Sequence, residues 1–166
     1  AASRGIDVLD APVSGGPHDV AAGHVTLFVG GGTDAVAKVT PVLSSYGDPV
    51  LHVGATGAGQ RVKLINNTLF AAQIGLVAEA ARLAERLGVD ESTLLAALPH
   101  GSGTSRALTS IAAAGSAATF IAAVGDFIGK DVAVIRATVA ELGSDLGVLD
   151  DIVDAGLASP STSANQ

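Results

Sequence analysis

The sequence predicts a mostly α-helical protein, in which the last part of a larger α/β domain leads into a long connecting helix and an all-helical domain. Short apolar runs bounded by glycine and proline fill residues 1–56. Three short strands and one helix cannot cover both faces of a sheet, so a larger domain is implied. Residues 60–87 contain no proline and a single glycine, Gly75, which predicts one helix of about 40 Å.

The first 56 residues justify the α/β part of this prediction. Three apolar runs predict strands at residues 6–13, 25–29 and 49–53. Thr33 is a candidate N-cap for a helix that runs to about Ser45, with Pro41 as either a new start or a kink. We therefore assign residues 1–56 to the C-terminal part of a larger α/β domain.

The remaining chain supplies the helices. Apolar residues on one stripe of the long helix are Val62, Ile65, Leu69, Ala72, Leu76, Leu83 and Leu87. Further helices are predicted at residues 91–98 with Asp90 as the cap, and at 106–114, 120–142 and 148–157. Residues 57–157 thus form the connecting helix with an all-α domain, and residues 158–166 a polar, disordered tail.

Composition narrows the choice of partners. A formal charge of −7 argues against nucleic acid, which requires a basic face, and the absence of cysteine excludes disulfides and fits a cytoplasmic protein. Residues 107–124 carry no charge but contain serine, threonine and many alanines. We interpret them as a buried helix pair broken near Gly115, and not as a membrane segment.

Lys63 is the first candidate for chemistry. It stands one turn inside the start of the long helix and four residues before Asn67, so both side chains share a face. A lysine near a helix N-terminus opposes the dipole, and asparagines are poor helix formers. Such local conflicts indicate a functional site, although a solvated first turn with an extended lysine would explain the same pattern.

Other candidates are weaker. Ser14, Gly15 and Gly16 follow a predicted strand and offer a hydroxyl and backbone amides to an anion such as a carboxylate, although a tight turn alone also favours glycine. Lys130 and Asp131 fit a surface charge pair. The four histidines show no metal-ligand spacing, so no metal is predicted.

Four sequence elements together resemble the β-hydroxyacid dehydrogenases, with most similarity to 3-hydroxyisobutyrate dehydrogenase and related semialdehyde reductases. These elements are D-A-P-V-S-G-G at residues 10–16, A-G-H-V-T at 22–26 with Gly30 and Gly31, G-A-G-Q-R-V-K-L-I-N-N at 57–67, and Lys130 with Asp131. The resemblance covers about residues 6–149. It implies that the α/β part is the end of a Rossmann-type domain.

The resemblance also implies roles for the candidates. Lys63 is the acid/base, Ser14, Gly15 and Gly16 bind the substrate carboxylate, Asn67 orients substrate or lysine, and Lys130 lies near the nicotinamide of NAD or NADP. The implied reaction interconverts a small β-hydroxy acid and its semialdehyde by hydride transfer.

This sequence departs from the family pattern in several places. Ala137 stands where many relatives have an acid, Arg106 follows Ser105 where tryptophan is frequent, and the Gly-rich loop of the nucleotide-binding domain is missing. We therefore expect the C-terminal portion of such an enzyme, inactive by itself.

Two further expectations concern assembly and an alternative function. The apolar stripe of the long helix predicts a homodimer or a higher homo-oligomer, with no membrane or nucleic-acid partner. The competing hypothesis is a non-catalytic helical dimerisation module with a vestigial site.

Overall fold

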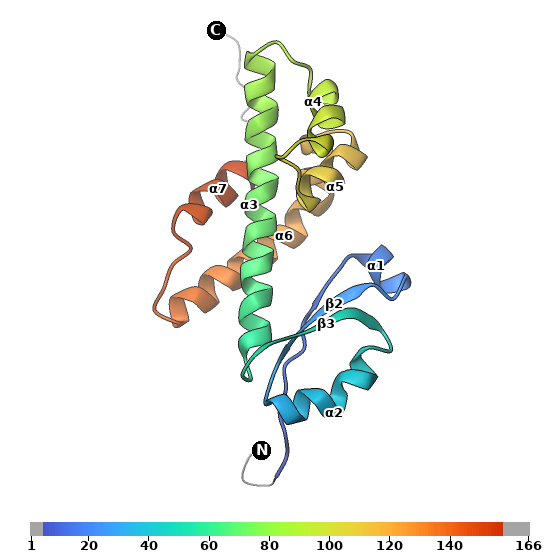
Figure 1. The fold of residues 1–166 in the computed structure, drawn as a ribbon. Coiled ribbons are helices and arrows are strands. Elements are labelled where there is room, and N and C mark those ends of the chain that lie inside the picture. Colours follow the sequence, from blue (N-terminus) through green and yellow to red (C-terminus); the bar gives the residue numbers. More distant parts are fainter. Residues whose placement is uncertain (1–4, 158–166) are drawn as a thin grey trace. The chain divides into compact units, whose positions relative to one another are not determined.

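A computed structural model describes residues 5–157 of the chain, and the predicted disordered tail at 158–166 lies outside the described residues. The structure is mostly helical with one small sheet, as the sequence predicts (Figure 1). It forms two compact units that meet within one long helix, α3 (Ala58–Arg86). Residues up to Asn66 belong to the first unit and those from Asn67 to the second.

The first unit contains a three-stranded sheet in the order β1-β2-β3. Strand β1 (Val13–Ser14) pairs antiparallel with β2 (Val25–Gly30), which pairs parallel with β3 (Gly47–Gly54). The strand predicted at residues 6–13 is wrong for most of its length, because only Val13 joins β1 and Asp10 forms an isolated bridge to Gly30. Alternating apolar residues do not make a strand unless a neighbouring strand accepts their hydrogen bonds.

Two helices accompany this sheet. Helix α1 (Pro17–Ala21) follows β1, and α2 (Thr33–Leu43) connects β2 to β3. The predicted capping role of Thr33 is wrong, because Gly32 occupies the N-cap and no side chain bonds there. Pro41 lies in the last turn and α2 continues through it. The small core of this unit consists of Leu27, Val29 and Val36 with Leu9, Ala11, Leu43 and Val50 packed against them.

The described part of the second unit, residues 67–157, contains helices and no strand. It contains α4 (Glu91–Ala97), the 3₁₀ turn η2 (Leu98–His100), α5 (Arg106–Ala114), α6 (Ala117–Glu141) and α7 (Val148–Leu157). Ser105 and Ser116 cap α5 and α6 with their side chains, whereas Asp90, predicted to cap α4, stands at the N-cap without a side-chain bond. The predicted break at Gly115 is confirmed: its φ of 85° ends α5, and α6 departs at 114°.

None of the described helices is by itself both long and apolar enough to cross a membrane, although the bent pair α5 and α6 would suffice by length and composition together.

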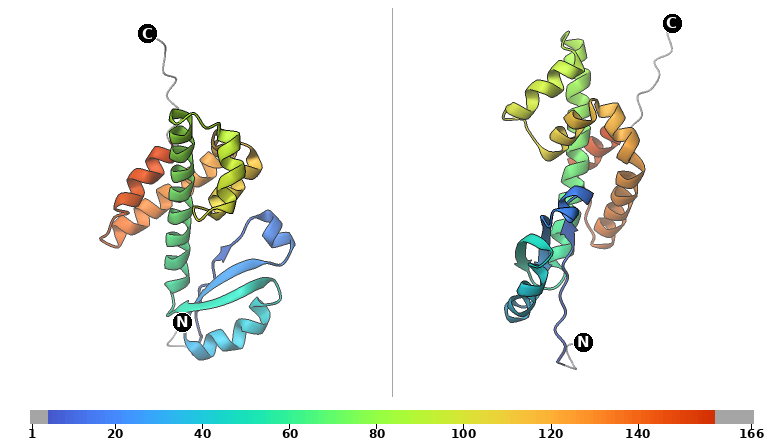
Figure 2. Two further views of the ribbon diagram at one scale, coloured as in Figure 1. Left: turned by 45° about the horizontal axis from the view of Figure 1, so that its top comes forward. Right: turned by 90° about the vertical axis from the view of Figure 1, so that its right-hand side faces the viewer.

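Helix α3 is a single unbroken rod of 29 residues, as predicted (Figure 2). Its predicted apolar stripe is largely not its core face. The buried positions are mostly small residues: Ala71, Ala72, Ile74, Val77, Ala78 and Ala84. The exposed positions hold the larger side chains: Ile65, Leu69, Leu76, Leu83 and Leu87. Small residues face the core because they let neighbouring helices approach closely.

One such approach joins α3 to α7. A Cβ added at Gly75 would run into the carbonyl oxygen of Ile152 and lie 3.3 Å from the Gly156 Cα. Both helices therefore require glycine where they cross. Around this crossing lies the main core of the unit, which includes Leu95, Leu108, Ile111, Ile128, Val132 and Val153.

Candidate active site

The first unit contains the Ser14-Gly15-Gly16 segment. Ser14 ends β1 opposite Thr26 of β2, and Gly15 and Gly16 lead into α1. The backbone N–H of Gly16 donates to the Asp19 carboxylate at 2.7 Å. This is half of a capping box, in which an acid in the first turn accepts from the residue before the helix. The turn therefore does accommodate a carboxylate, in this case one supplied by the chain itself.

Lys63 belongs to the same unit. It lies in the second turn of α3 and is partly buried. Three residues further along, the Asn66 amide approaches the Ser14 hydroxyl, with Nδ2 and Oγ 3.5 Å apart. The described structure thus links the start of α3 to the Ser14 segment through Asn66, which belongs to the motif at residues 57–67 and precedes the candidate Asn67.

The start of α3 is held by a carboxylate from far along the chain. Asp10 accepts from the backbone N–H of Gly57 through Oδ1 at 2.6 Å and from that of Gln60 through Oδ2 at 2.7 Å. These two N–H groups are among those that a helix cannot satisfy internally. Helix α3 has no acidic residue in its own first turn, so Asp10 supplies the negative charge that favours a helix N-terminus.

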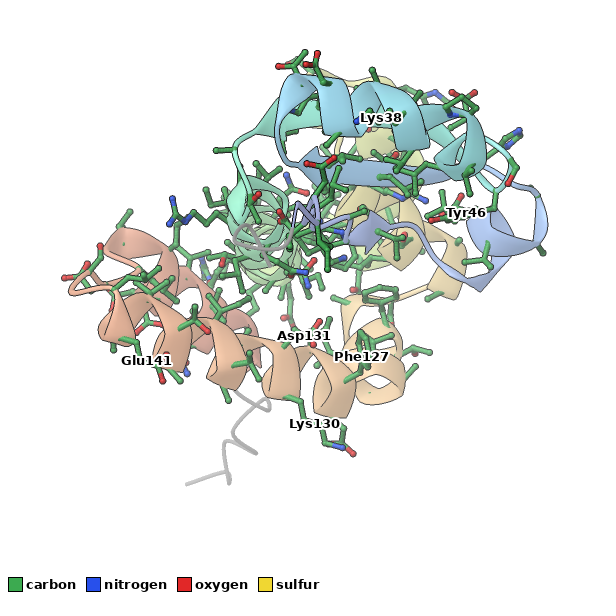
Figure 3. All side chains as sticks on the ribbon, turned by 90° about the horizontal axis from the view of Figure 1, so that it is seen from below. Lys38, Tyr46, Phe127, Lys130, Asp131 and Glu141 are labelled. Atoms are coloured by element: carbon green, nitrogen blue, oxygen red, sulfur yellow. The ribbon has the colours of Figure 1, made fainter. Side chains whose placement is uncertain are left out.

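Asn67 and Lys130 belong to the second unit. The Asn67 amide donates from Nδ2 to the Asp131 carboxylate of α6 at 3.2 Å. Lys130 itself is exposed, and Figure 3 shows it pointing away from α6 on the side opposite to Asp131. The two neighbouring residues therefore have different surroundings: Asp131 contacts α3, whereas Lys130 extends into solvent.

Three acidic residues in these networks received no role from the sequence: Asp10, Asp19 and Asp131. Asp10 opens the D-A-P-V-S-G-G segment, yet its partners lie 47 and 50 positions away. No local spacing pattern reaches that far. The one available signal was that α3 needs an acid near its start and lacks one within itself.

Metal binding finds no support among residues 5–157, where no three histidine, aspartate or glutamate side chains come together to hold an ion. His52 has a structural contact instead. Its Nε2 lies 2.8 Å from the carbonyl oxygen of Gly31.

Known family models match both parts of the chain. Residues 57–159 match the family described as NAD-binding of NADP-dependent 3-hydroxyisobutyrate dehydrogenase. Residues 1–54 match the NAD binding domain of 6-phosphogluconate dehydrogenase. The chain belongs to the β-hydroxyacid dehydrogenase family. The predicted resemblance is confirmed.

Individual members of this β-hydroxyacid dehydrogenase family show how far the similarity extends. The 2-(hydroxymethyl)glutarate dehydrogenase of Eubacterium barkeri is 42% identical over 108 residues, which are 65% of this chain and 36% of that protein. The 3-hydroxyisobutyrate dehydrogenase of Pseudomonas aeruginosa is 39% identical over 108 residues, with the same coverage. The chain spans little more than a third of the length of these relatives.

Solved structures give the same family fold. The 3-hydroxyisobutyrate dehydrogenase of Mycobacterium tuberculosis with L-serine superposes with a TM-score of 0.71 and 31% identity, covering 88% of this chain and 53% of that one. A 3-hydroxyisobutyrate dehydrogenase from Salmonella typhimurium gives a TM-score of 0.68 at 26% identity, covering 92% and 54%.

Proposed function

We propose that this chain is the C-terminal portion of an NAD(P)-dependent β-hydroxyacid dehydrogenase, which interconverts a small β-hydroxy acid of the 3-hydroxyisobutyrate type and its semialdehyde. The family membership supports the reaction class. The coverage of about half of the solved relatives supports the status as a portion. Relatives are named for substrates that are small hydroxy acids, among them 3-hydroxyisobutyrate and L-threonate.

The observation that supports the proposal is the contact between α3 and the Ser14 segment within one unit: the Asn66 amide, about one helical turn after Lys63, lies 3.5 Å from the Ser14 hydroxyl. Ser14, Gly15 and Gly16 bind the substrate carboxylate through the hydroxyl and backbone amides. Gly16 now donates to Asp19, so on substrate binding it exchanges one carboxylate partner for another.

Lys63 then acts as the acid/base. In the oxidative direction its neutral amine takes the proton from the substrate hydroxyl as the adjacent C–H bond breaks and the carbonyl forms. When bound, NAD or NADP supplies the acceptor for the hydride. A lysine suits this task because its amine can accept and release a proton, which the guanidinium of arginine does not do in this pH range.

Asn67 and Lys130 complete the proposed site. Asn67 orients substrate or lysine, one helical turn after Lys63, and its bond to Asp131 keeps the amide in a defined rotamer. We assign Lys130 to the cofactor, because its exposed ammonium could bind a polar group of the dinucleotide. The sequence has no G-x-G-x-x-G loop for the pyrophosphate. This 166-residue chain alone should therefore bind NAD(P) only weakly. We also propose that this enzyme is located in the cytoplasm.

The test is Lys63→Arg in the longer enzyme that contains this chain. Arginine keeps the charge and size but does not release a proton in the working range, so kcat should fall by about 10²- to 10⁴-fold. Cofactor affinity, measured by calorimetry, should stay unchanged.

Three companion variants separate the roles. Asn67→Ala should lower kcat less, and Ser14→Ala should mainly raise KM, because the amides of Gly15 and Gly16 remain. Lys130→Arg is the deciding control. If it abolishes turnover while Lys63→Arg does not, the acid/base role belongs to Lys130.

A second candidate function is favoured by the exposed stripe of α3. Large apolar side chains at Ile65, Leu69, Leu76, Leu83 and Leu87 are all exposed, and such a stripe is typical of an interface. We propose that a second copy of the chain covers it. The stripe supports an oligomeric dehydrogenase and, equally, a module that only dimerises.

Sedimentation tests the interface. The chain should sediment as a dimer or larger at micromolar concentration, and Leu76→Lys should weaken association at least about tenfold because it places a charge in an apolar contact. Lys38→Leu, at an exposed position of α2, is the control outside the stripe. A monomer near 16.2 kDa for the unmodified chain would contradict the proposal.

A further inference from the structure

Asp10 makes contacts of two kinds within the first unit. Its backbone forms both hydrogen bonds of a bridge with Gly30: its N–H donates to the Gly30 oxygen at 3.0 Å, and its oxygen accepts from the Gly30 N–H at 2.8 Å. Its carboxylate accepts from Gly57 and Gln60 at the start of α3. One residue thus joins the end of β2 to the beginning of the helix that carries Lys63.

Two glycines leave space for this carboxylate. A Cβ at Gly30 would collide with Asp10 Oδ1. A Cβ at Gly59 would lie 2.7 Å from Asp10 Oδ2, 3.0 Å from a carbon of Pro12, and against the Phe28 carbonyl. Both glycines are needed for the close approach and not for an unusual backbone angle. Because the backbone at both glycines lies so close to the Asp10 carboxylate, the carboxylate has little room to move, which restricts where the first turn of α3 lies.

The chain on either side of Asp10 extends this restraint to the proposed site. The Pro12 carbonyl accepts from the Phe28 N–H at 3.0 Å, and Val13 and Ser14 pair with Leu27 and Thr26. Ser14 therefore follows four residues after the Asp10 attachment. On α3, Lys63 follows three residues after Gln60. Both groups are therefore placed relative to Asp10: Ser14 through the short segment that pairs with β2, and Lys63 through the first turns of α3, which the Asp10 carboxylate binds.

From this geometry we propose that Asp10 is a positioning residue, which fixes Lys63 relative to the Ser14-Gly15-Gly16 segment by binding the first turn of α3. The inference rests on the proposed function, because it assigns Asp10 to the same reaction. Among the described residues, the hydrogen bonds of Asp10 are with backbone groups, and we assign it no part in proton transfer. Its effect on turnover is indirect, through the place of the Lys63 amine.

Asp10→Asn is the main test variant, since it keeps the size but turns one oxygen into an N–H donor that faces another donor. Amide hydrogen exchange of the variant chain should be faster at Gly57 and Gln60. In the longer enzyme, kcat should fall about 10- to 100-fold, which is the scale of loss for a misplacement near 1 Å. Dinucleotide affinity should not change.

Gln60→Pro tests the same contact from the other partner. It removes the N–H that donates to Asp10, at a first-turn position where proline is tolerated. It should lower kcat in the same direction and keeps the test valid if Asp10→Asn does not fold. Glu91→Gln is the matched control, because the Glu91 carboxylate also binds a helix start, at the Ala117 N–H of α6 at 2.8 Å. It should lose stability without losing kcat.

The outcomes separate the inference from the function on which it rests. Unchanged exchange at Gly57 and Gln60 in Asp10→Asn would overturn the inference, as would an unchanged kcat alongside an inactive Lys63→Arg enzyme. If Lys63→Arg keeps its turnover, the proposed function fails first, and the exchange data still show whether Asp10 fixes the helix. Equal kcat losses in Asp10→Asn and Glu91→Gln would reduce Asp10 to a general stabilising cap.

Discussion

The start of α3, up to residue 66, is held by backbone hydrogen bonds donated to a carboxylate and by glycine contacts with the sheet, whereas residues 67–86 are held mainly by apolar packing of small side chains. Hydrogen bonds to a carboxylate are directional and set a position within narrow limits. Packing of alanine, valine and isoleucine gives more free energy but depends less on direction. Hydrogen bonding therefore sets the position of the first part of α3, and apolar packing stabilises the second part.

Ile74→Ala compared with Leu76→Ala is the strongest test of the packing part. Ile74 is fully buried and Leu76 is 53% exposed. Ile74→Ala should lower the free energy of unfolding by about 2–5 kcal/mol, and Leu76→Ala by less than about 1 kcal/mol. Urea denaturation at a protein concentration too low for self-association measures both. Equal losses would show that the exposed stripe is packed within the single chain.

Gly75→Ala tests the packed part of α3 where this helix crosses α7. The new methyl group would meet the backbone of α7, which cannot yield as a side chain can, so a loss of about 1–3 kcal/mol is expected. Gly129→Ala is the control, because Gly129 lies inside α6 with open space around it. Alanine there should raise stability by about 0.5–1 kcal/mol through helix propensity. A neutral Gly75→Ala would mean that α7 moves freely on α3.

Glu79→Gln probes a polar contact within the packed part and should have the smallest effect. The hydrogen bond from Arg82 lowers the pKa of the Glu79 carboxyl, and Arg82 also donates to the Ala155 carbonyl of α7 at 3.1 Å. Because the pKa of Glu79 is lower in the folded than in the unfolded state, its ionised carboxylate stabilises the fold at pH values above the unfolded-state pKa. This stabilisation is lost as the pH falls through the folded-state pKa. Both groups are exposed, so the contribution is small.

Thermal unfolding at neutral pH and at pH about 3 measures this contribution. The unmodified chain should be slightly more stable than Glu79→Gln at neutral pH, and the difference should shrink in acid. A difference that grows in acid would contradict the assignment. Added salt should reduce the neutral-pH difference, because the pair is open to solvent.

Most of the helices and the family follow from sequence patterns alone, although the short helix α1 (Pro17–Ala21) was not predicted. The bounds of α5 and α7 and the existence of α3 follow from spacing of apolar residues, because a helix is formed by contacts within four residues. The motifs around Ser14, Lys63 and Lys130 carried the family resemblance for the same reason, since each is a short run of adjacent residues.

The buried face of each element and its long-range hydrogen-bond partners are visible only in the folded structure. Periodicity located an apolar stripe on α3 but could not show that alanines and Gly75 face the core while the leucines are exposed. Residues 6–9 look like a strand, yet pairing requires a neighbour that sequence pattern does not reveal. The role of Asp10 depends on Gly57 and Gln60, 47 and 50 positions away. Contacts at that separation exist only once the chain has folded, because sheet and helix must first bring the carboxylate and the two N–H groups together.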